Sequence, residues 1–447
     1  MKELTKGNPL KVICLFSLPI LLGRLFNLAY SLADMKILGY FLGKDAIAAA
    51  GSVSSLYDLT NSFIIGLTNG FGVITAMHYG SGSMDKTKRS LTTSVTLSII
   101  FSLSMIAVCF LAFNPILDLL NVSDTVRQSA SEYIAIMLAG LVFSAFYNCL
   151  AASLRAVGDA YTPLIFLILS TILNILLDIA FVGSLGLGTK GAAAATVASQ
   201  IICAVLCHIY TFIRYKELRF GLKDLILQKE TGIRALLSSG MSMALMSSMV
   251  AFGTLSLQSA INSLGDNIVV AHAATRKLSG IYMLPFGVFG TAMATYSGQN
   301  YGAGRIDRIK EGIKVTVIIS CIYSALCVLV SYTICPGIIE ALTSTSETEI
   351  ITNAVNYQKF DTLFYVVTAF ISVYRNALQG MGEHKLPVVS SFAELLGKLL
   401  IALFLTPVLK YTAIIIAEPV VWIIMVIPLI YGIHKKMNGS KKHGGSE

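Results

Sequence analysis

Four polar residues of the N-terminal half lie inside long apolar segments and could together bind a small cation: Asp34, Asn174, Asp178 and Thr196. Asn174 and Asp178 are four residues apart, so they share one face of a helix. Two carboxylates, an amide and a hydroxyl form an all-oxygen set, which suits a hard cation such as Na⁺, while paired carboxylates can instead share a proton. A second interpretation stays open, in which these groups form separate hydrogen bonds, or a neutralised pair, that hold helices together.

Other polar residues accompany these four at helical spacing. Asn27, Ser31 and Asp34 follow one another at successive spacings of four and three residues, so they share one helical face. Gln200 follows Thr196 by four residues. We expect the following residues to line a cavity: Asn27, Tyr30, Ser31, Gln200 and Arg276.

The composition explains why polar residues inside these segments are unusual. The chain has 447 residues, of which 55% are apolar and only 13% are charged, whereas soluble domains carry about 25% charged residues. This balance excludes a disordered chain and disfavours a soluble enzyme. It predicts an all-α polytopic membrane protein, in which each ionisable residue at a helix centre costs about 2.5–3.5 kcal/mol on insertion scales.

About twelve apolar runs are long enough to cross a hydrocarbon core of ~30 Å as helices. They cover residues 10–36, 46–77, 90–117, 127–154, 162–183, 191–213, 233–262, 268–298, 313–339, 350–378, 387–409 and 411–433. In this arrangement Asp34, Asp178 and Thr196 fall near the outer ends of their spans, within ~10 Å of one depth.

The longest polar stretch divides the spans into two sets of six. The expected parts are an N-terminal lobe (1–213), a cytoplasmic linker (214–232), a C-terminal lobe (233–434) and a basic cytoplasmic tail (435–447). Basic residues gather in the N-terminus, alternate connectors, the linker and the tail, so the positive-inside rule predicts that both termini are cytoplasmic. The net charge of +9 is therefore an orientation signal in the cell membrane, and we expect no nucleic-acid partner.

The two halves repeat each other. Residues 79–82 (Tyr-Gly-Ser-Gly) recur as residues 301–304 (Tyr-Gly-Ala-Gly), 222 positions later, and residues 154–159 match 378–383 at an offset of 224. Because each half has an even number of spans, the halves share one membrane orientation. The repeat predicts two pseudo-symmetric lobes, an arrangement that places a substrate cavity at the repeat interface.

The C-terminal half contains different charges. Glu394 and Lys398 are four residues apart, so we expect them to neutralise each other. Lys359 and Asp361 lie on different helical faces and cannot pair directly.

The sequence contains no convincing motif for catalysis or for cofactor binding. Residues 186–191 satisfy GxGxxG but link two spans without a βαβ unit. The sequence has no HExxH, no GxSxG and no P-loop. We therefore expect no enzymatic activity and no cofactor, with H⁺ or Na⁺ as the only coupling ion.

Several further segments, spread over essentially the whole chain, form a pattern: Gly7-Asn8-Pro9-Leu10, Ala33-Asp34, Gly43-Lys44-Asp45-Ala46, Arg155-Ala156-Val157-Gly158-Asp159, Ala273-Ala274-Thr275-Arg276 and Gly298-Gln299-Asn300-Tyr301-Gly302-Ala303-Gly304. In order and spacing they resemble the multidrug and toxic compound extrusion (MATE) transporters. The resemblance implies a V-shaped pair of six-helix lobes that works by alternating access as a cation-coupled antiporter.

The resemblance also implies which lobe binds the ion. The pattern of the DinF-like branch maps onto Asp34, Asn174, Asp178 and Thr196, with Ala192 as a backbone contributor, and Pro19 matches the kink of its first helix. The NorM-like branch uses acids of the C-terminal lobe, and at those positions this chain has Val250 and Thr368. We therefore expect the ion site in the N-terminal lobe.

Together these observations predict a monomer in the lipid bilayer that exports lipophilic or cationic small molecules in exchange for H⁺ or Na⁺. The four oxygen-bearing residues would bind Na⁺ directly if that is the ion. A flippase for a lipid-linked saccharide is the nearest alternative, although only scattered basic residues would face its substrate. An intramembrane enzyme is the alternative from another class, and the sequence shows no nucleophile and base at matching depths.

Overall fold

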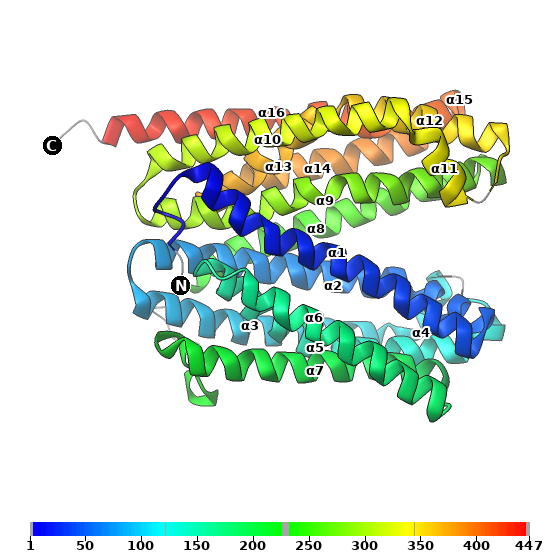
Figure 1. The fold of residues 1–447 in the computed structure, drawn as a ribbon, viewed down its shortest axis with the longest axis horizontal. Coiled ribbons are helices and arrows are strands. Elements are labelled where there is room, and N and C mark those ends of the chain that lie inside the picture. Colours follow the sequence, from blue (N-terminus) through cyan, green and yellow to red (C-terminus); the bar gives the residue numbers. More distant parts are fainter. Residues whose placement is uncertain (1–2, 121, 226–231, 344, 444–447) are drawn as a thin grey trace. The chain divides into compact units, whose positions relative to one another are not determined.

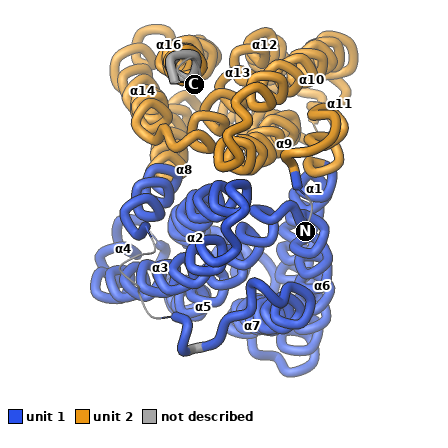
Figure 2. Tube along the Cα trace, turned by 90° about the vertical axis from the view of Figure 1, so that its left-hand side faces the viewer, with its two compact units in different colours: residues 1–3, 18–244 blue, residues 4–17, 245–447 orange. Residues whose placement is uncertain are grey.

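The computed structural model describes residues 3–120, 122–225, 232–343 and 345–443, and within them the chain is helical without any strand. It divides into two compact units, which are residues 1–3 with 18–244 and residues 4–17 with 245–447 (Figure 2). Part of the expected linker (226–231) and the end of the expected tail (444–447) lie outside the described residues. The lobe boundaries expected from the sequence stay a prediction.

Unit 1 contains the helices that hold the four oxygen-bearing residues (Figure 1). In chain order they are α1 (Pro9–Leu42, from residue 18), α2 (Lys44–Gly80), α3 (Met84–Leu111), α4 (Phe113–Leu119), α5 (Asp124–Ala156), α6 (Tyr161–Asp178), a π-helix (Ile179–Ser184), α7 (Gly188–Arg214), two 3₁₀ turns (Lys216–Leu218 and Leu222–Asp224) and the start of α8 (Ile233–Asn262). Helix α5 is central, because α2, α3 and α7 all pack against it, while α6 packs against α7.

Unit 2 is built in the same order. It contains the first turns of α1, the remainder of α8, α9 (Asp266–Gly302), α10 (Ile306–Thr333), α11 (Cys335–Thr343), α12 (Thr348–Leu363), α13 (Tyr365–Gly380), α14 (Lys385–Leu400), a π-helix (Ile401–Leu405), α15 (Thr406–Leu409) and α16 (Tyr411–His443). Helix α9 packs against α10, α12 and α13, and α14 packs against α16.

The helices confirm the internal repeat. Helices α2 and α9 both have 37 residues and begin 222 positions apart, and α3 and α10 both have 28 residues at the same offset. Helices α6 and α14 begin 224 positions apart, and each continues into a π-helix. The two units are therefore pseudo-symmetric in their succession of elements.

Two predicted spans are interrupted, which corrects the expectation of single helices at 90–117 and 350–378. Helix α3 ends at Leu111 because Pro115 has no N–H to donate to the Leu111 carbonyl. Helix α12 ends at Leu363, and the Phe364 amide donates to the Asp361 carbonyl (3.1 Å), a three-residue spacing typical of a 3₁₀ turn. Of the helices in the described residues, eleven are long and apolar enough to span a membrane; α12 with α13 is the interrupted twelfth.

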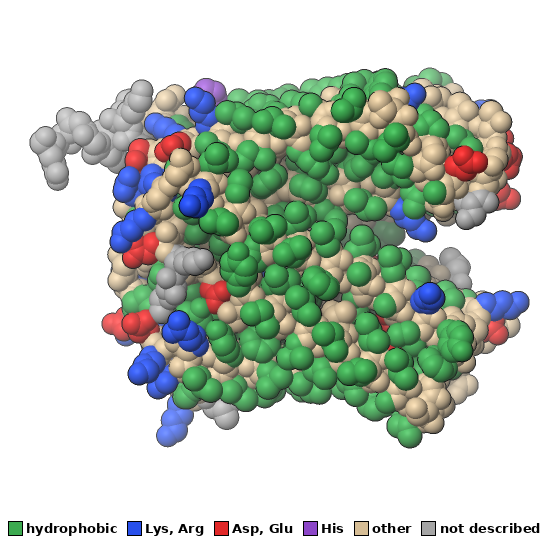
Figure 3. Space-filling view, in the orientation of Figure 1, with side chains coloured by type: hydrophobic (Ala, Val, Ile, Leu, Met, Phe, Trp, Pro, Cys, Tyr) green, Lys and Arg blue, Asp and Glu red, His purple; other side chains and the backbone are tan. Residues whose placement is uncertain are grey.

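The surface is consistent with a lipid environment. On the face drawn in Figure 3, hydrophobic side chains cover the middle of the helices, and charged side chains gather near the helix ends. Single residues expose large apolar areas, among them Leu111 at 88% and Ile322 at 66%. In water such continuous apolar surface would promote aggregation, whereas in a bilayer it faces hydrocarbon.

The N-terminal segment packs against unit 2, to which it belongs. The Leu4 amide donates to Oε1 of Gln299 (2.8 Å), and Arg308 donates to the carbonyls of Gly7 (2.9 Å) and Leu4 (3.3 Å). From there α1 continues into unit 1, and Pro19 follows directly after the change of unit at residues 17 and 18. Proline removes a backbone hydrogen bond inside a helix, so α1 bends more easily at Pro19 than elsewhere along its length.

Within unit 1, two glycines of α2 allow the first turns of α8 to approach closely. A Cβ atom at Gly70 would lie 2.4 Å from the Ser239 carbonyl oxygen, and one at Gly66 would lie 2.6 Å from the Met243 carbonyl oxygen. The Ser239 hydroxyl donates to the Gly70 carbonyl at 2.8 Å. This small-residue pair, four positions apart, is the pattern by which membrane helices associate.

The close approach predicts that Gly70→Ala lowers the thermal unfolding midpoint of the purified protein, because overpacking costs about 1–3 kcal/mol. Gly51→Ala in the same helix is the control, since a Cβ there meets nothing within 4 Å. Equal midpoints for the two variants would contradict this packing.

Candidate cation site of the N-terminal unit

Three helices bring together the four oxygen-bearing residues. Helix α1 carries Asp34, α6 carries Asn174 and ends at Asp178, and α7 carries Thr196. Asn174, Asp178 and Thr196 are buried, with 1%, 0% and 5% of their surface exposed, and Asp34 is half-buried.

Direct contacts connect the side chains in two pairs. The Asn174 amide donates to the Thr196 hydroxyl at 3.2 Å, and the carboxyl groups of Asp34 and Asp178 lie within hydrogen-bonding reach of each other. As carboxylates, neither of these two acids has a proton to donate. Accordingly, both carboxylate oxygens of Asp178, Oδ1 of Asp34 and Oδ1 of Asn174 are buried without a donor.

This arrangement leaves a group of oxygen atoms without a hydrogen-bond donor or a positively charged partner. A proton shared by the two carboxyl groups would satisfy it, and so would a small cation bound between the carboxylates and the Asn174 oxygen. Asp178 also lies where α6 changes to the π-helix (Ile179–Ser184). Such π segments are frequent at functional sites, because they change the direction of side chains within a continuous helix.

The five residues expected to line a cavity have different surroundings in the structure. The Tyr30 hydroxyl lies 3.3 Å from that of Thr196, and Gln200 is hydrogen-bonded to Tyr57 of α2. Asn27 and Ser31 are exposed. Arg276 belongs to unit 2, where it contacts Glu418.

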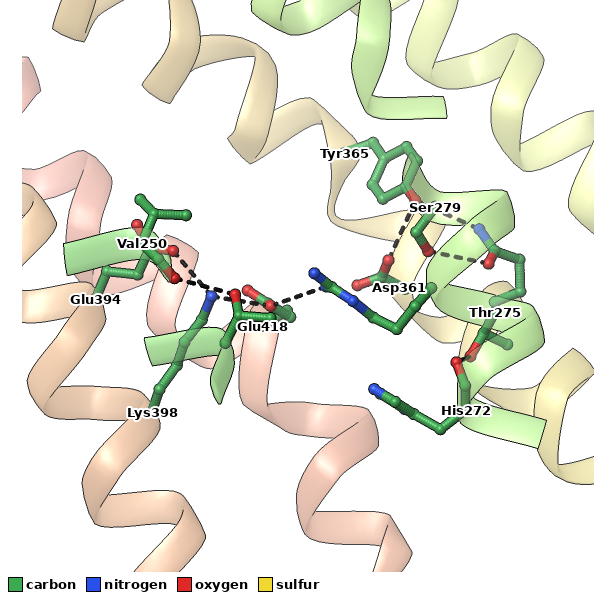
Figure 4. Close-up of polar contacts among 12 residues, drawn as sticks. Val250, His272, Thr275, Ser279, Asp361, Tyr365, Glu394, Lys398 and Glu418 are labelled. Atoms are coloured by element: carbon green, nitrogen blue, oxygen red, sulfur yellow. Dashed lines mark hydrogen bonds and ion pairs between the residues drawn. The ribbon is translucent and has the colours of Figure 1, made fainter. Parts of the chain in front are cut away.

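A second polar cluster lies in unit 2 (Figure 4). Lys398 is almost fully buried, and its Nζ lies 2.9 Å from Glu394 and 3.0 Å from Glu418. The Glu418 carboxylate also contacts Arg276 at 3.5 Å. The expected pairing of Glu394 with Lys398 is confirmed, whereas Glu418 was not recognised as its second partner, since it lies on another helix.

Asp361 lies near this cluster and is hydrogen-bonded to a separate set of neutral groups. The Tyr365 hydroxyl donates to Oδ2 of Asp361 at 3.2 Å, and Gln358 donates to Tyr365 and accepts from Ser279. As expected, Lys359 does not pair with Asp361; its ammonium lies over the ring of Tyr332. The four-residue spacing of Asp361 and Tyr365 is the sequence signal that could have indicated their contact.

The two clusters occupy equivalent helices of the repeat. Asn174 and Lys398 are 224 positions apart, the offset between α6 and α14, and Thr196 and Glu418 are equivalent to within one residue on α7 and α16. The same helix pair is thus joined by a neutral hydrogen bond in unit 1 and by an ion pair in unit 2. In unit 2 the ammonium of Lys398 therefore stands where unit 1 has an uncharged amide.

The family model MatE matches residues 19–180 and 242–404, which is most of the chain. The chain belongs to the MatE family. It is 31% identical over 307 residues to "Probable multidrug resistance protein YpnP" of Bacillus subtilis, covering 69% of this chain and 68% of that protein. It is 25% identical over 395 residues to "Probable multidrug resistance protein NorM" of Thermotoga maritima, covering 86% and 83%.

A solved structure has the same fold. The one described as "Crystal structure of MATE in the bent conformation" superimposes with a TM-score of 0.91 over 99% of this chain and 98% of that one, at 21% identity. The MatE protein is thus a multi-pass membrane transporter of the multidrug efflux type and not an enzyme.

For this MatE protein, the buried ion pairs predict that Lys398→Met strongly destabilises unit 2. Removing the ammonium takes the ion-pair partner from Glu394 and leaves Glu418 with Arg276 alone. Breaking a buried pair in this way costs about 3–5 kcal/mol. The thermal unfolding midpoint should fall clearly below that of Lys359→Met, a control that removes a lysine without a carboxylate partner in the described residues. A fall no larger than in the control would show that the pairs are energetically unimportant.

Proposed function

We propose that this MatE protein is a secondary antiporter that exports lipophilic or cationic small molecules in exchange for H⁺ or Na⁺. The observation that carries the proposal is the meeting of Asp34 and Asp178 beside the Asn174–Thr196 pair, with several oxygen atoms left without a donor. The relatives named as multidrug resistance proteins support a drug-like substrate.

The physical basis of the coupling is charge compensation. Two adjacent carboxylates in a low-dielectric environment repel each other, and a bound proton or Na⁺ removes this repulsion. Binding of the cation and of a cationic substrate then compete for the same negative charge. Pro19 gives α1, which carries Asp34, a place to bend as the charge state changes.

The driving force is sufficient for efflux. One elementary charge that crosses a potential of ~100 mV releases about 2.3 kcal/mol. At ~1.4 kcal/mol for each factor of ten, this corresponds to about fiftyfold accumulation of substrate outside. A concentration gradient of the coupling ion adds to this value.

The proposal predicts that Asp34→Asn abolishes gradient-driven efflux from proteoliposomes, because the amide can neither bind a proton nor supply a charged ligand. The matched control is Asp124→Asn, which removes an exposed carboxylate at the start of α5 in the same unit and should retain transport. Wild-type transport by Asp34→Asn, with normal incorporation into vesicles, would refute the assignment of the site.

The same vesicles identify the ion when a proton gradient and a Na⁺ gradient are imposed separately. Asn174→Ala serves as the second variant. If Na⁺ is the ion, loss of this amide oxygen should weaken the Na⁺ dependence, whereas a proton shared by the carboxyl groups needs no such ligand.

We also propose that both termini lie in the cytoplasm, since basic residues gather in the N-terminus, the linker and the tail. A reporter that is active only in the cytoplasm should therefore be active after residue 447 and inactive in the connector at Gly265, between α8 and α9. The reverse pattern would invert the topology.

A further inference from the structure

Two arginines on membrane-spanning helices of unit 1 have no acidic partner. Arg24 lies on α1 and is exposed, and Arg155 is the penultimate residue of α5 and is half-buried. In the described part of the chain, no carboxylate forms an ion pair with either of them. The acid closest to Arg155 in sequence is Asp159, and its carboxylate instead accepts from the amide and hydroxyl groups of Thr162 and from the hydroxyl of Tyr215. Unit 1 itself therefore supplies no counter-charge for these two guanidinium groups.

The two arginines are neighbours. Arg24 lies close enough to Arg155 for their charges to repel each other. The internal repeat indicates the same proximity: with the offset of 222 between α2 and α9, Arg24 corresponds to Met246, and with the offset of 224 between α6 and α14, Arg155 corresponds to Gln379. In unit 2 this equivalent pair is buried and in direct contact, with 3.3 Å between the Gln379 amide nitrogen and the Met246 sulfur. Unit 1 thus has two cations where unit 2 has two neutral side chains.

Hydrogen-bond donors surround this pair. Nη2 of Arg155 donates to Oδ1 of Asn69 on α2 (3.0 Å), which orients both side chains. Among the described residues, neither the Asn69 amide nitrogen nor any nitrogen of Arg24 has an acceptor. Tyr147, the other titratable group that faces Arg155, donates its proton to the Pro163 carbonyl (2.9 Å) and offers no negative charge. Donors from α1, α2 and α5 are therefore left for an acceptor that the described residues do not supply.

We propose that unit 1 binds an oxyanion, the phosphate or carboxylate group of an amphiphilic molecule, between Arg24 and Arg155, with the amide nitrogen of Asn69 as a third donor. The planar fork of a guanidinium group matches such oxyanions with two parallel hydrogen bonds. A bound anion also removes the repulsion between the two cations. The site is separate from the candidate cation site, because Arg24 precedes Asp34 by ten residues on α1, or about 15 Å along the helix.

Two kinds of molecule present an oxyanion at the depth of this site. Arg155 lies in the last turn of α5. Gly23, next to Arg24, packs against Leu167 of α6 (a Cβ there would lie 3.3 Å from the leucine Cδ2), within two turns of the start of that helix. The site is therefore near the helix ends, where a membrane lipid has its phosphate and where an amphiphilic substrate enters from water. The chemistry of the site is the same for both sources.

The test measures binding of octyl phosphate to the full-length purified protein in a neutral maltoside detergent by titration calorimetry, with protein-free micelles as the blank. Arg24→Met combined with Arg155→Gln introduces the neutral pair that the equivalent positions of unit 2 already accommodate. We expect the double variant to bind octyl phosphate about tenfold to a hundredfold more weakly than the wild type, the loss typical of charge-assisted hydrogen bonds. Octyltrimethylammonium, which has the same tail and the opposite charge, should give the same titration with both proteins.

Arg214→Gln is the matched control, because it removes an exposed arginine at the end of α7 in the same unit and should leave the affinity unchanged. Equal affinities of the wild type and the double variant for octyl phosphate would overturn the proposal, and so would an equal loss in Arg214→Gln. If the double variant does not fold, Arg24→Met alone replaces it, since this change leaves the contact between Arg155 and Asn69 intact.

Competition identifies the source of the oxyanion. Phosphatidylglycerol is added to the mixed micelles in one series, and phosphatidylcholine in a matched series. Displacement of octyl phosphate by phosphatidylglycerol alone assigns the site to an anionic lipid headgroup, whereas displacement by neither lipid assigns it to the acidic group of a smaller substrate. Octanoate in place of octyl phosphate then compares a carboxylate with a phosphate. Each of these results presupposes the site and requires that binding depends on Arg24 and Arg155.

This proposal does not rest on the antiport mechanism. Binding is measured at equilibrium, without an ion gradient and with Asp34 and Asp178 unchanged. Efflux that is insensitive to Asp34→Asn would leave the oxyanion site intact. Conversely, a failure to bind octyl phosphate has no bearing on the candidate cation site.

Discussion

A bilayer core offers neither hydrogen bonds nor solvation of charge, and this constraint determines most of the structure. Backbone groups are satisfied inside helices, and the interruptions at Leu111 and Phe364 divide a span into two helices without unpairing a long segment. Charged side chains are tolerated where a partner is close, as for Lys398 between Glu394 and Glu418. Where such a partner is missing, as at the meeting of Asp34 with Asp178, an added cation has the largest effect.

Much of this arrangement could be predicted from sequence periodicity, and the remainder depends on contacts between helices. Apolar runs and the offset of 222 residues predicted the spans and the repeat, because hydrophobic length and turn glycines are local signals. The pairing of Glu394 with Lys398 followed from four-residue spacing, whereas Glu418 was missed as a partner because its contact requires the packing of α14 on α16. Tyr365 was missed as the partner of Asp361, although the same four-residue spacing was present in the sequence. Spacing likewise selected Asn174 and Asp178, but only the fold shows that Asn174 meets Thr196.

The two units have the same succession of helices but differ in the charge of one equivalent contact between helices. On α6 and α7 the contact between helices is a neutral amide to hydroxyl hydrogen bond, while on α14 and α16 the equivalent contact is between an ammonium and a carboxylate. A lysine is a cation that is covalently attached to the chain, so its position cannot be vacated and refilled during a transport cycle. A site made of acids and amides can exchange its ion. In our interpretation this difference explains why the halves, although alike in fold, are unequal in chemistry.

The attachment of the N-terminal segment to unit 2 has a consequence for biosynthesis. Leu4 is synthesised 295 residues before its partner Gln299. At about 5–20 residues per second, this interval lasts roughly 15–60 s. During this time the hydrogen-bonding groups of Leu4 and Gly7 must be satisfied by water or by a chaperone, and unit 2 cannot be completed by the second half of the chain alone. The order of synthesis therefore delays the native contacts of Leu4 and Gly7 until Gln299 and Arg308 have been made.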